Sequence, residues 1–155
     1  IFFYLNKSHI YSGDIYPDIF SYKSERIKIF FIDCSSENSI NDKIINNDLS
    51  YDIIIEDAGH FLKDQIICLF MCFKKLKSKG VYIVEELNFP DTREDMRKNC
   101  SGPTLKQILN KIINNEDFDS IYINEEDKKY FLNHYNSIEI FMGKQGNDIA
   151  FIKKK

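Results

Sequence analysis

Two short apolar runs that end in acidic residues constrain the fold of this chain more than any other feature of its sequence. The first, YDIIIED, covers residues 51–57, and the second, GVYIVEE, covers residues 80–86. Runs of this length that are bounded by polar residues predict strands buried on both faces, as in a parallel sheet. The segment between them, from about Phe61 to Lys79, has the length and apolar periodicity of a helix.

The strand–helix–strand order places the acidic ends of both runs at one edge of the predicted sheet. A crossover of this kind is right-handed and makes its two strands parallel, so their carboxyl ends lie together. Open α/β sheets bind their ligands at that edge. The residues that the sequence gathers there are Asp57, His60, Glu85 and Glu86.

The remaining segments extend the same alternation of strands and helices. We expect the end of a helix at 1–6, a helix at 62–76 inside the crossover, and a long loop at 88–102, either a substrate lid or a disordered connector. Further helices are expected at 39–47 and 104–114, and further strands at 9–14, 27–33, 119–123, 137–142 and 148–153. The last two strands flank a glycine-containing turn, which predicts an antiparallel hairpin. The sequence therefore predicts one α/β domain over residues 1–155, with a mostly parallel sheet that ends in a hairpin.

Four successive predicted strands end in acid, at Asp14, Asp33, Glu56–Asp57 and Glu85–Glu86. One strand that ends in an acid is common, but four along a parallel sheet would line a single edge with negative charge. Such an edge suits a cationic or hydroxyl-rich ligand and a hard metal ion.

The composition excludes several classes of protein. A net charge of −3 without a basic stripe argues against binding to nucleic acid. No apolar run approaches the roughly 20 residues that cross a bilayer, and no signal peptide is recognisable, so we expect a cytoplasmic protein that does not bind membranes. None of the four cysteines stands in a Cys-x-x-Cys pair, which argues against a zinc site or redox motif, and we interpret Cys68 and Cys72 as reduced core residues. The oligomeric state stays open, with a homo-oligomer among the alternatives.

Four motifs resemble those of the class I S-adenosylmethionine-dependent methyltransferases. Within that class the chain looks like the magnesium-dependent sugar O-methyltransferases of macrolide pathways and their cephalosporin hydroxylase-like relatives. Their Asp-Asp-Gly-Ser-His motif stands here as EDAGH at 56–60, and their Gly-Gly-x-Tyr-x-Ile-Glu-Asp motif as KGVYIVEE at 79–86. Their Tyr-Gly-x-Asp and Gly-Asp-x-Ser strand ends correspond to YSGD at 11–14 and IDCS at 32–35. The resemblance covers nearly the whole chain and implies a Rossmann-like sheet.

The resemblance implies a role for each motif residue. It implies that Asp57, Glu85 and Glu86 hold a magnesium ion and that His60 is the general base. The residues implied to bind S-adenosylmethionine are Gly13, Asp14, Asp33 and Ser35. The substrate would be a small molecule, a sugar or glycoside hydroxyl whose proton the base removes while the oxygen is aligned with the methyl group. The chain opens on IFFYL without a start or cap signal, so we expect the family's first strand and glycine-rich loop to precede it.

Structural interpretations compete with these roles. Asp57 alone could cap the following helix, His60 could be a packing residue, and the acids at 85–86 could be a solvated strand end. Asp14 could be a plain turn residue, and for Asp33 the two interpretations are evenly balanced. Two other functions also remain, namely a degenerate methyltransferase-like domain without catalysis and, less favoured, a nucleotide-dependent oxidoreductase.

Overall fold

A computed structural model describes residues 7–16, 24–97, 99–144 and 146–155, and it divides the chain into two compact units. The first unit is Ile1–Asp33 and the second is Cys34–Lys155. The helix end expected at 1–6 lies outside the described residues. Within the described residues, no helix is long and apolar enough to cross a membrane.

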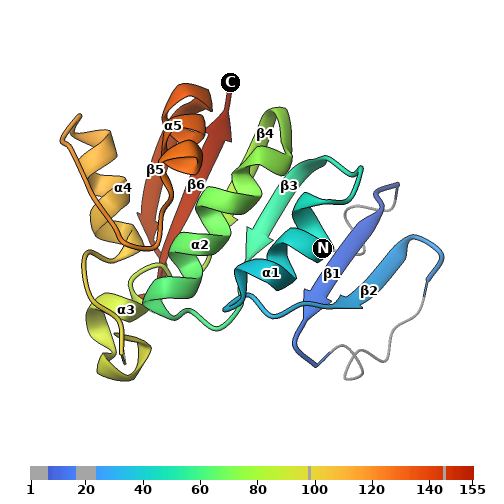
Figure 1. Cartoon of the computed structure of the whole chain (residues 1–155), viewed down its shortest axis with the longest axis horizontal. Coiled ribbons are helices and arrows are strands. Elements are labelled where there is room, and N and C mark those ends of the chain that lie inside the picture. The colour runs from blue at the N-terminus through green and yellow to red at the C-terminus, as the bar shows by residue number, and fades with distance from the viewer. Residues whose placement is uncertain (1–6, 17–23, 98, 145) are drawn as a thin grey trace. The chain divides into compact units, whose positions relative to one another are not determined.

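The first unit contains a pair of parallel strands, β1 (Ile10–Asp14) and β2 (Ile27–Phe31), in which Ile10 lies opposite Ile27 and Asp14 lies opposite Phe31. Figure 1 shows the pair in the two blues near the N-terminus. Both strands were predicted from sequence, and β2 ends two residues before Asp33.

The second unit is built on a four-stranded sheet in the order β3-β4-β6-β5. The strands are β3 (Tyr51–Glu56), β4 (Leu76–Val84), β5 (Tyr135–Met142) and β6 (Asp148–Lys154). β3 and β4 are parallel, whereas β6 is antiparallel to both of its neighbours. The predicted crossover and the predicted C-terminal hairpin are therefore both present.

Short helices connect and cover these strands (Figure 1). The α-helices are α1 (Glu37–Ile40), α2 (Leu62–Cys72), α3 (Phe89–Thr92), α4 (Leu105–Ile113) and α5 (Glu125–His134). A π-helical turn over Asn41–Ile45 continues α1, and a 3-10 turn over Phe73–Lys75 ends α2. A further 3-10 turn over Glu94–Arg97 follows α3. Capping residues in the sequence explain two of the starts. Thr104 and Gln107 form a reciprocal capping box on α4, and the side chain of Asn124 accepts a hydrogen bond from Asp127 N at 2.8 Å in α5.

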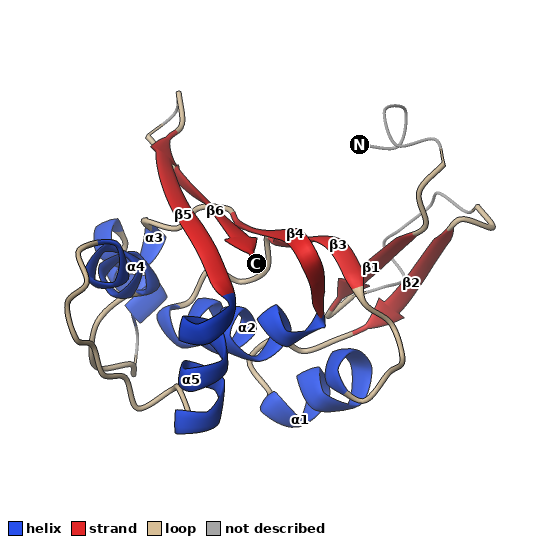
Figure 2. Cartoon of the chain, turned by 90° about the horizontal axis from the view of Figure 1, so that it is seen from above, coloured by secondary structure: helices blue, strands red, loops and turns tan. Residues whose placement is uncertain are grey.

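The helices of the second unit leave one face of its sheet open. Figure 2 shows α2 and α5 on the same side of the strands. On that side Tyr82, Val84 and Ile152 are each at most 1% exposed. On the other side Ile53 and Ile55 of β3 are 49% and 42% exposed. The prediction that β3 is buried on both faces is therefore wrong.

Lys154 joins the last strand to the helical layer. Its Nζ donates to the carbonyl of Leu76 at 2.7 Å and to the hydroxyl of Tyr130 at 2.8 Å. It also lies 3.4 Å and 3.5 Å from the carbonyl oxygens of Lys74 and Phe73, which belong to the 3-10 turn after α2. This buried ammonium thus takes up carbonyls that the end of a helix leaves without partners.

Three other predictions at the level of elements need correction. The expected strand at 119–123 is a turn, and the expected loop at 88–102 contains α3 and a 3-10 turn. Gly80 was expected between helix and strand, but it lies inside β4, where a Cβ would come within 2.9 Å of the carbonyl oxygen of Lys77. Strand β4 starts at Leu76, earlier than expected, and its register with β3 shifts between Tyr51 and Ile53.

Candidate active site

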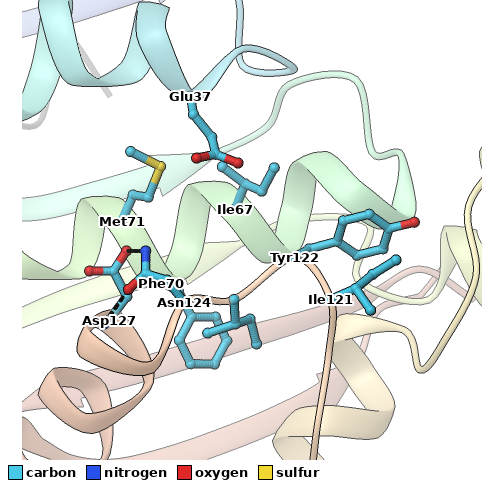
Figure 3. A pocket seen from close by; sticks show the side chains of 9 residues that line it. Glu37, Ile67, Phe70, Met71, Ile121, Tyr122, Asn124 and Asp127 are labelled. Atoms are coloured by element: carbon cyan, nitrogen blue, oxygen red, sulfur yellow. Dashed lines mark hydrogen bonds between the residues drawn. The ribbon is translucent and has the colours of Figure 1, made fainter.

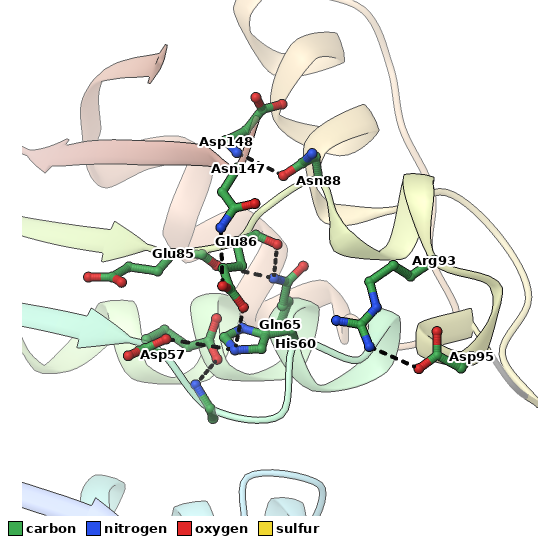
Figure 4. A network of polar contacts seen from close by, with 12 residues as sticks. Asp57, His60, Gln65, Glu85, Glu86, Asn88, Arg93, Asp95, Asn147 and Asp148 are labelled. Carbon is green, nitrogen blue, oxygen red and sulfur yellow. Dashed lines mark hydrogen bonds and ion pairs between the residues drawn. The ribbon is translucent and has the colours of Figure 1, made fainter. Parts of the chain in front are cut away.

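The carboxyl ends of β3 and β4 bring a histidine and two acids into contact. Because the strands are parallel, Glu56 lies opposite Val84, and the segments that follow both strands leave the sheet together. His60 Nε2 lies 2.9 Å from Glu86 Oε2 and 3.7 Å from Asp57 Oδ1. Figure 4 shows the three side chains converging. The spatial grouping predicted for these residues is thus present in the second unit.

The backbone at this edge adopts an unusual conformation. His60 and Glu86 have φ angles of +55° and +50°, in the left-handed region that residues other than glycine seldom enter. Such a conformation costs on the order of 1 kcal/mol per residue and persists only where the surroundings enforce it. Here it turns both side chains toward each other, which a regular helix start or strand end would not do.

The His60 ring is largely buried and packs against one aromatic side chain. Its side chain is 15% exposed, and its ring packs edge-on against Phe89 with 5.4 Å between ring centroids. The guanidinium carbon of Arg93 lies over the same Phe89 ring, 4.9 Å from its centroid. Within the described residues, His60 Nδ1 is buried without a hydrogen-bond partner. The polar contacts of the His60 ring are therefore made by Nε2.

The competing interpretation of Asp57 as a helix cap is contradicted. Helix α2 has Phe61 at its N-cap position, and no side chain caps it there. The Asp57 side chain is 60% exposed and lies within reach of His60 instead.

Glu85 shares the edge but points elsewhere. Its carboxylate is directed away from His60 in Figure 4, and it has no hydrogen-bond or ion-pair partner among the described residues. Partial burial and the negative charges of Asp57 and Glu86 raise the pKa of Glu85, and His60 partly offsets this rise. Negative charge therefore crowds the end of β4.

Glu56, the first residue of the EDAGH motif, is a buried acid rather than an edge residue. It is 5% exposed, and Ala58 N donates to its Oε1 at 3.1 Å. Burial, with smaller contributions from neighbouring acids, raises the pKa of Glu56 to about 7, although the bond from Ala58 acts in the opposite direction. Its second oxygen, Oε2, is buried without a hydrogen-bond partner within the described residues.

The residue types at this edge of the sheet are suited to a magnesium ion. Three carboxylates at the ends of adjacent strands supply the oxygen ligands that a hard cation prefers, and their mutual repulsion would be relieved by a positive ion. Across the described residues, however, no group of three or more His, Cys, Asp or Glu side chains is arranged to hold a metal ion. The donor types therefore fit magnesium, while the roles of Asp57, Glu85 and Glu86 as its ligands stay a prediction.

The residues expected to bind S-adenosylmethionine lie in both units. In the first unit, Asp14 ends β1 and its Oδ1 accepts a hydrogen bond from Tyr16 N at 2.7 Å, as a turn residue would. A Cβ at Gly13 would lie 2.6 Å from Ile32 Cγ2, so packing alone requires glycine there. Asp33 follows β2, and Ser35 is an exposed residue of the second unit. Their roles in cofactor binding stay predictions.

Two amide side chains that were not predicted from the sequence, Asn147 and Gln65, complete the site. Asn147, in the turn between β5 and β6, donates through Nδ2 to Glu86 Oε1 at 3.2 Å. Gln65 of α2 donates through Nε2 to the main-chain carbonyl of Glu86 at 3.3 Å. No local pattern marks either residue, because each contacts a partner at least 21 positions away along the chain.

A pocket of ≈160 Å³ on the helical side of the second unit is separate from this edge. Its wall includes Ile67 and Met71 of α2, the loop residue Tyr122, and Asp127 of α5 (Figure 3). The Asp127 carboxylate is already held by Asn124 Nδ2 at 2.8 Å and by an ion pair with Lys74. None of the predicted site residues lines this pocket.

Comparison with solved structures gives the class of fold. The chain is similar to the MycE methyltransferase from the mycinamycin biosynthetic pathway in complex with Mg, SAH and mycinamycin VI, with a TM-score of 0.66 and 18% sequence identity. A second crystal form of MycE with Mg and SAH gives a TM-score of 0.65 at the same identity. Each match covers 94% of this chain and 36% of the MycE chain, so the chain spans about a third of the length of the structures it matches.

These similarities establish the predicted fold, an α/β sheet of the class I methyltransferase type that ends in an antiparallel hairpin. No protein-family model matches the sequence, and no curated protein matches it.

Proposed function

We propose that this chain is part of an S-adenosylmethionine-dependent O-methyltransferase that acts, with a divalent metal ion, on a hydroxyl of a sugar or glycosylated small molecule. The observation that carries the proposal is the contact of His60 with Glu86 and Asp57 at the carboxyl edge of a methyltransferase-type sheet. Structures of MycE with Mg, SAH and a macrolide support the choice of cofactor, metal and substrate class.

In this proposal His60 removes the proton from the substrate hydroxyl as the methyl group is transferred. Histidine is the side chain that most often serves as a general base. The 2.9 Å contact of Nε2 with Glu86 orients the ring for this role. The packing of Phe89 against the ring limits the access of water to it.

The proposed metal ligands are Asp57, Glu85 and Glu86. When bound, a divalent ion would lower the pKa of the substrate hydroxyl and neutralise the acids that crowd the end of β4. The proposed cofactor residues are Asp14 and Gly13 of the first unit with Asp33 and Ser35, where an acid at a strand end would accept hydrogen bonds from ribose hydroxyls.

The test is methyl transfer from S-adenosylmethionine to sugar and glycoside hydroxyls by the intact protein. We expect the rate to fall by a factor of about 10²–10⁴ in His60→Ala, the usual contribution of a general base. Removal of divalent metal by a chelator should also suppress the reaction, and added magnesium should restore it. His9→Ala, which changes an exposed histidine of the first unit, is the matched control and should keep the wild-type rate.

Two results would contradict the proposal. One is an undiminished rate in the chelator or in His60→Ala. The other is a calorimetric titration in which the intact protein binds neither magnesium nor S-adenosylmethionine, which would instead favour a methyltransferase-like domain without catalysis.

A further inference from the structure

Glu86 connects the candidate base to the C-terminal hairpin. One of its carboxylate oxygens, Oε2, contacts His60 Nε2 at 2.9 Å, and the other, Oε1, accepts the amide hydrogen of Asn147 Nδ2 at 3.2 Å. Figure 4 shows Asn147 reaching toward Glu86 from the turn between β5 and β6. A residue 61 positions later in the chain therefore holds the carboxylate that faces the imidazole.

The turn that carries Asn147 is itself fixed to the segment after β4. The buried Asn88 accepts a hydrogen bond from Asp148 N at 2.7 Å and donates to the carbonyl of Gly146 at 2.9 Å. Leu87 N donates to the carbonyl of Asp148 at 2.9 Å. These bonds bracket Asn147 on both sides, so its main chain is held in place independently of its side chain.

The main chain of Glu86 is also held, which leaves the direction of its side chain to its two partners. Gln65 Nε2 bonds the Glu86 carbonyl at 3.3 Å, and the φ angle of +50° fixes where the side chain starts. The neighbouring Glu85 lacks a hydrogen-bond or ion-pair partner for its side chain among the described residues and points away from His60. The contrast between Glu85 and Glu86 shows that an acidic residue at the end of β4 does not necessarily contact the imidazole of His60.

We infer that Asn147 is a positioning residue: it holds the Glu86 carboxylate against His60, so that the imidazole keeps one orientation. The inference rests on the proposed function, in which His60 is the base. Amide partners of this kind orient a charged group without contacting the reacting atoms, and their loss typically costs 10- to 100-fold in activity or metal affinity.

The first experiment measures methyl transfer by Asn147→Ala and Asn147→Asp in the intact protein. We expect kcat to fall by about tenfold or more in both variants with little change in KM, because a positioning contact acts on the base rather than on substrate binding. In Asn147→Asp a second carboxylate would repel Glu86 rather than hold it. The matched control is Asn136→Ala, an exposed asparagine on β5 of the same hairpin, which should keep the wild-type kcat.

A double-mutant cycle separates positioning from a general loss of structure. On a Glu86→Ala background, which removes the acceptor of Asn147, Asn147→Ala should lower kcat by far less than it does in the wild type, because the contact is already absent. Equal losses on both backgrounds would overturn the inference.

A spectroscopic measurement on the chain itself needs no activity. Nitrogen-resolved NMR of the histidine rings should show the His60 ring signals shifted or broadened in Asn147→Ala and unchanged in Asn136→Ala. If the intact protein transfers no methyl group but the His60 signals still respond to Asn147→Ala, the proposed function fails and the positioning role survives. If methyl transfer depends on His60 but neither kcat nor the ring signals respond to Asn147→Ala, the inference fails and the proposed function survives.

Discussion

The two faces of the four-stranded sheet in the second unit carry similar side chains in very different environments. On the face covered by α2 and α5, Ile152 of β6 is fully buried, whereas on the opposite face Ile55 of β3 is 42% exposed (Figure 2). Both are isoleucines in the interior of a strand, so neither composition nor strand propensity distinguishes them. We conclude that the stability of this unit comes mainly from the packing of one helical layer against the sheet, and three substitutions can test this conclusion.

Ile152→Ala should have the largest effect. Deletion of a fully buried isoleucine removes its transfer free energy and leaves a cavity, which together cost about 2–5 kcal/mol. Urea unfolding followed by circular dichroism measures the loss in the free energy of unfolding. A loss below about 1 kcal/mol would show that the covered face is not the main source of stability.

Glu56→Gln should have an intermediate effect that depends on pH. Glu56 lies on the covered face, and its pKa is about 7 in the folded chain against an ordinary value of 4.5. Between these values the folded state binds more protons than the unfolded state, so the free energy of unfolding falls as the pH rises through this window. The glutamine side chain of the variant does not titrate, so its free energy of unfolding should not fall for this reason.

The effect of Glu56→Gln can be measured as a difference between variant and wild type at two pH values. We expect the variant to gain about 2–3 kcal/mol relative to the wild type on going from about pH 5 to about pH 8, from 1.36 kcal/mol per pKa unit. Histidines titrate in the same range, but they contribute equally to both proteins. An advantage for the variant that is the same at both pH values would contradict the buried, high-pKa state of Glu56.

Ile55→Ala should have the smallest effect, below about 1 kcal/mol, because a side chain that is already half exposed loses little contact when it is truncated. The same unfolding experiment measures it beside Ile152→Ala. A loss as large as that of Ile152→Ala would mean that the open face is covered in solution.

The sequence predicted most of the elements that place the site. The strands β3 and β4 and the acids that follow them were expected because an apolar run bounded by acids is a local signal. The exposure of Ile53 and Ile55 could not be predicted from the sequence. A run of isoleucines places equally apolar side chains on both faces of the sheet, and only the placement of the helices decides which face is covered.

The local sequence explains one wrong prediction, the strand at 119–123, and one helix that was not predicted, α5. The segment 119–123 looks like a strand, yet Asp119 Oδ1 accepts from Ser120 N at 2.8 Å and Ser120 Oγ accepts from Tyr122 N at 3.3 Å, so side chains take up the main-chain hydrogens that a strand would use. Helix α5 was not predicted because Glu125–His134 is mostly polar, although Asn124 marks its start.

The proximity of three candidate site residues was predicted, whereas their individual contacts were not. The motif spacing brought His60, Asp57 and Glu86 together, as the structure shows, but it could not indicate that Glu85 turns away or that the positive φ angles at His60 and Glu86 direct their side chains. Those details depend on partners that are distant in sequence, such as Asn147.

The buried ammonium of Lys154 has a consequence for how the second unit opens. Its acceptors come from Leu76 at the start of β4 and from Tyr130 in α5, so the last strand, a central strand and a helix share a single cation. If any one of the three detaches, a positive charge is left inside the protein with too few oxygens around it. Fraying of the C-terminal strand is therefore coupled to the release of the helical layer, and the two should come apart as one cooperative event.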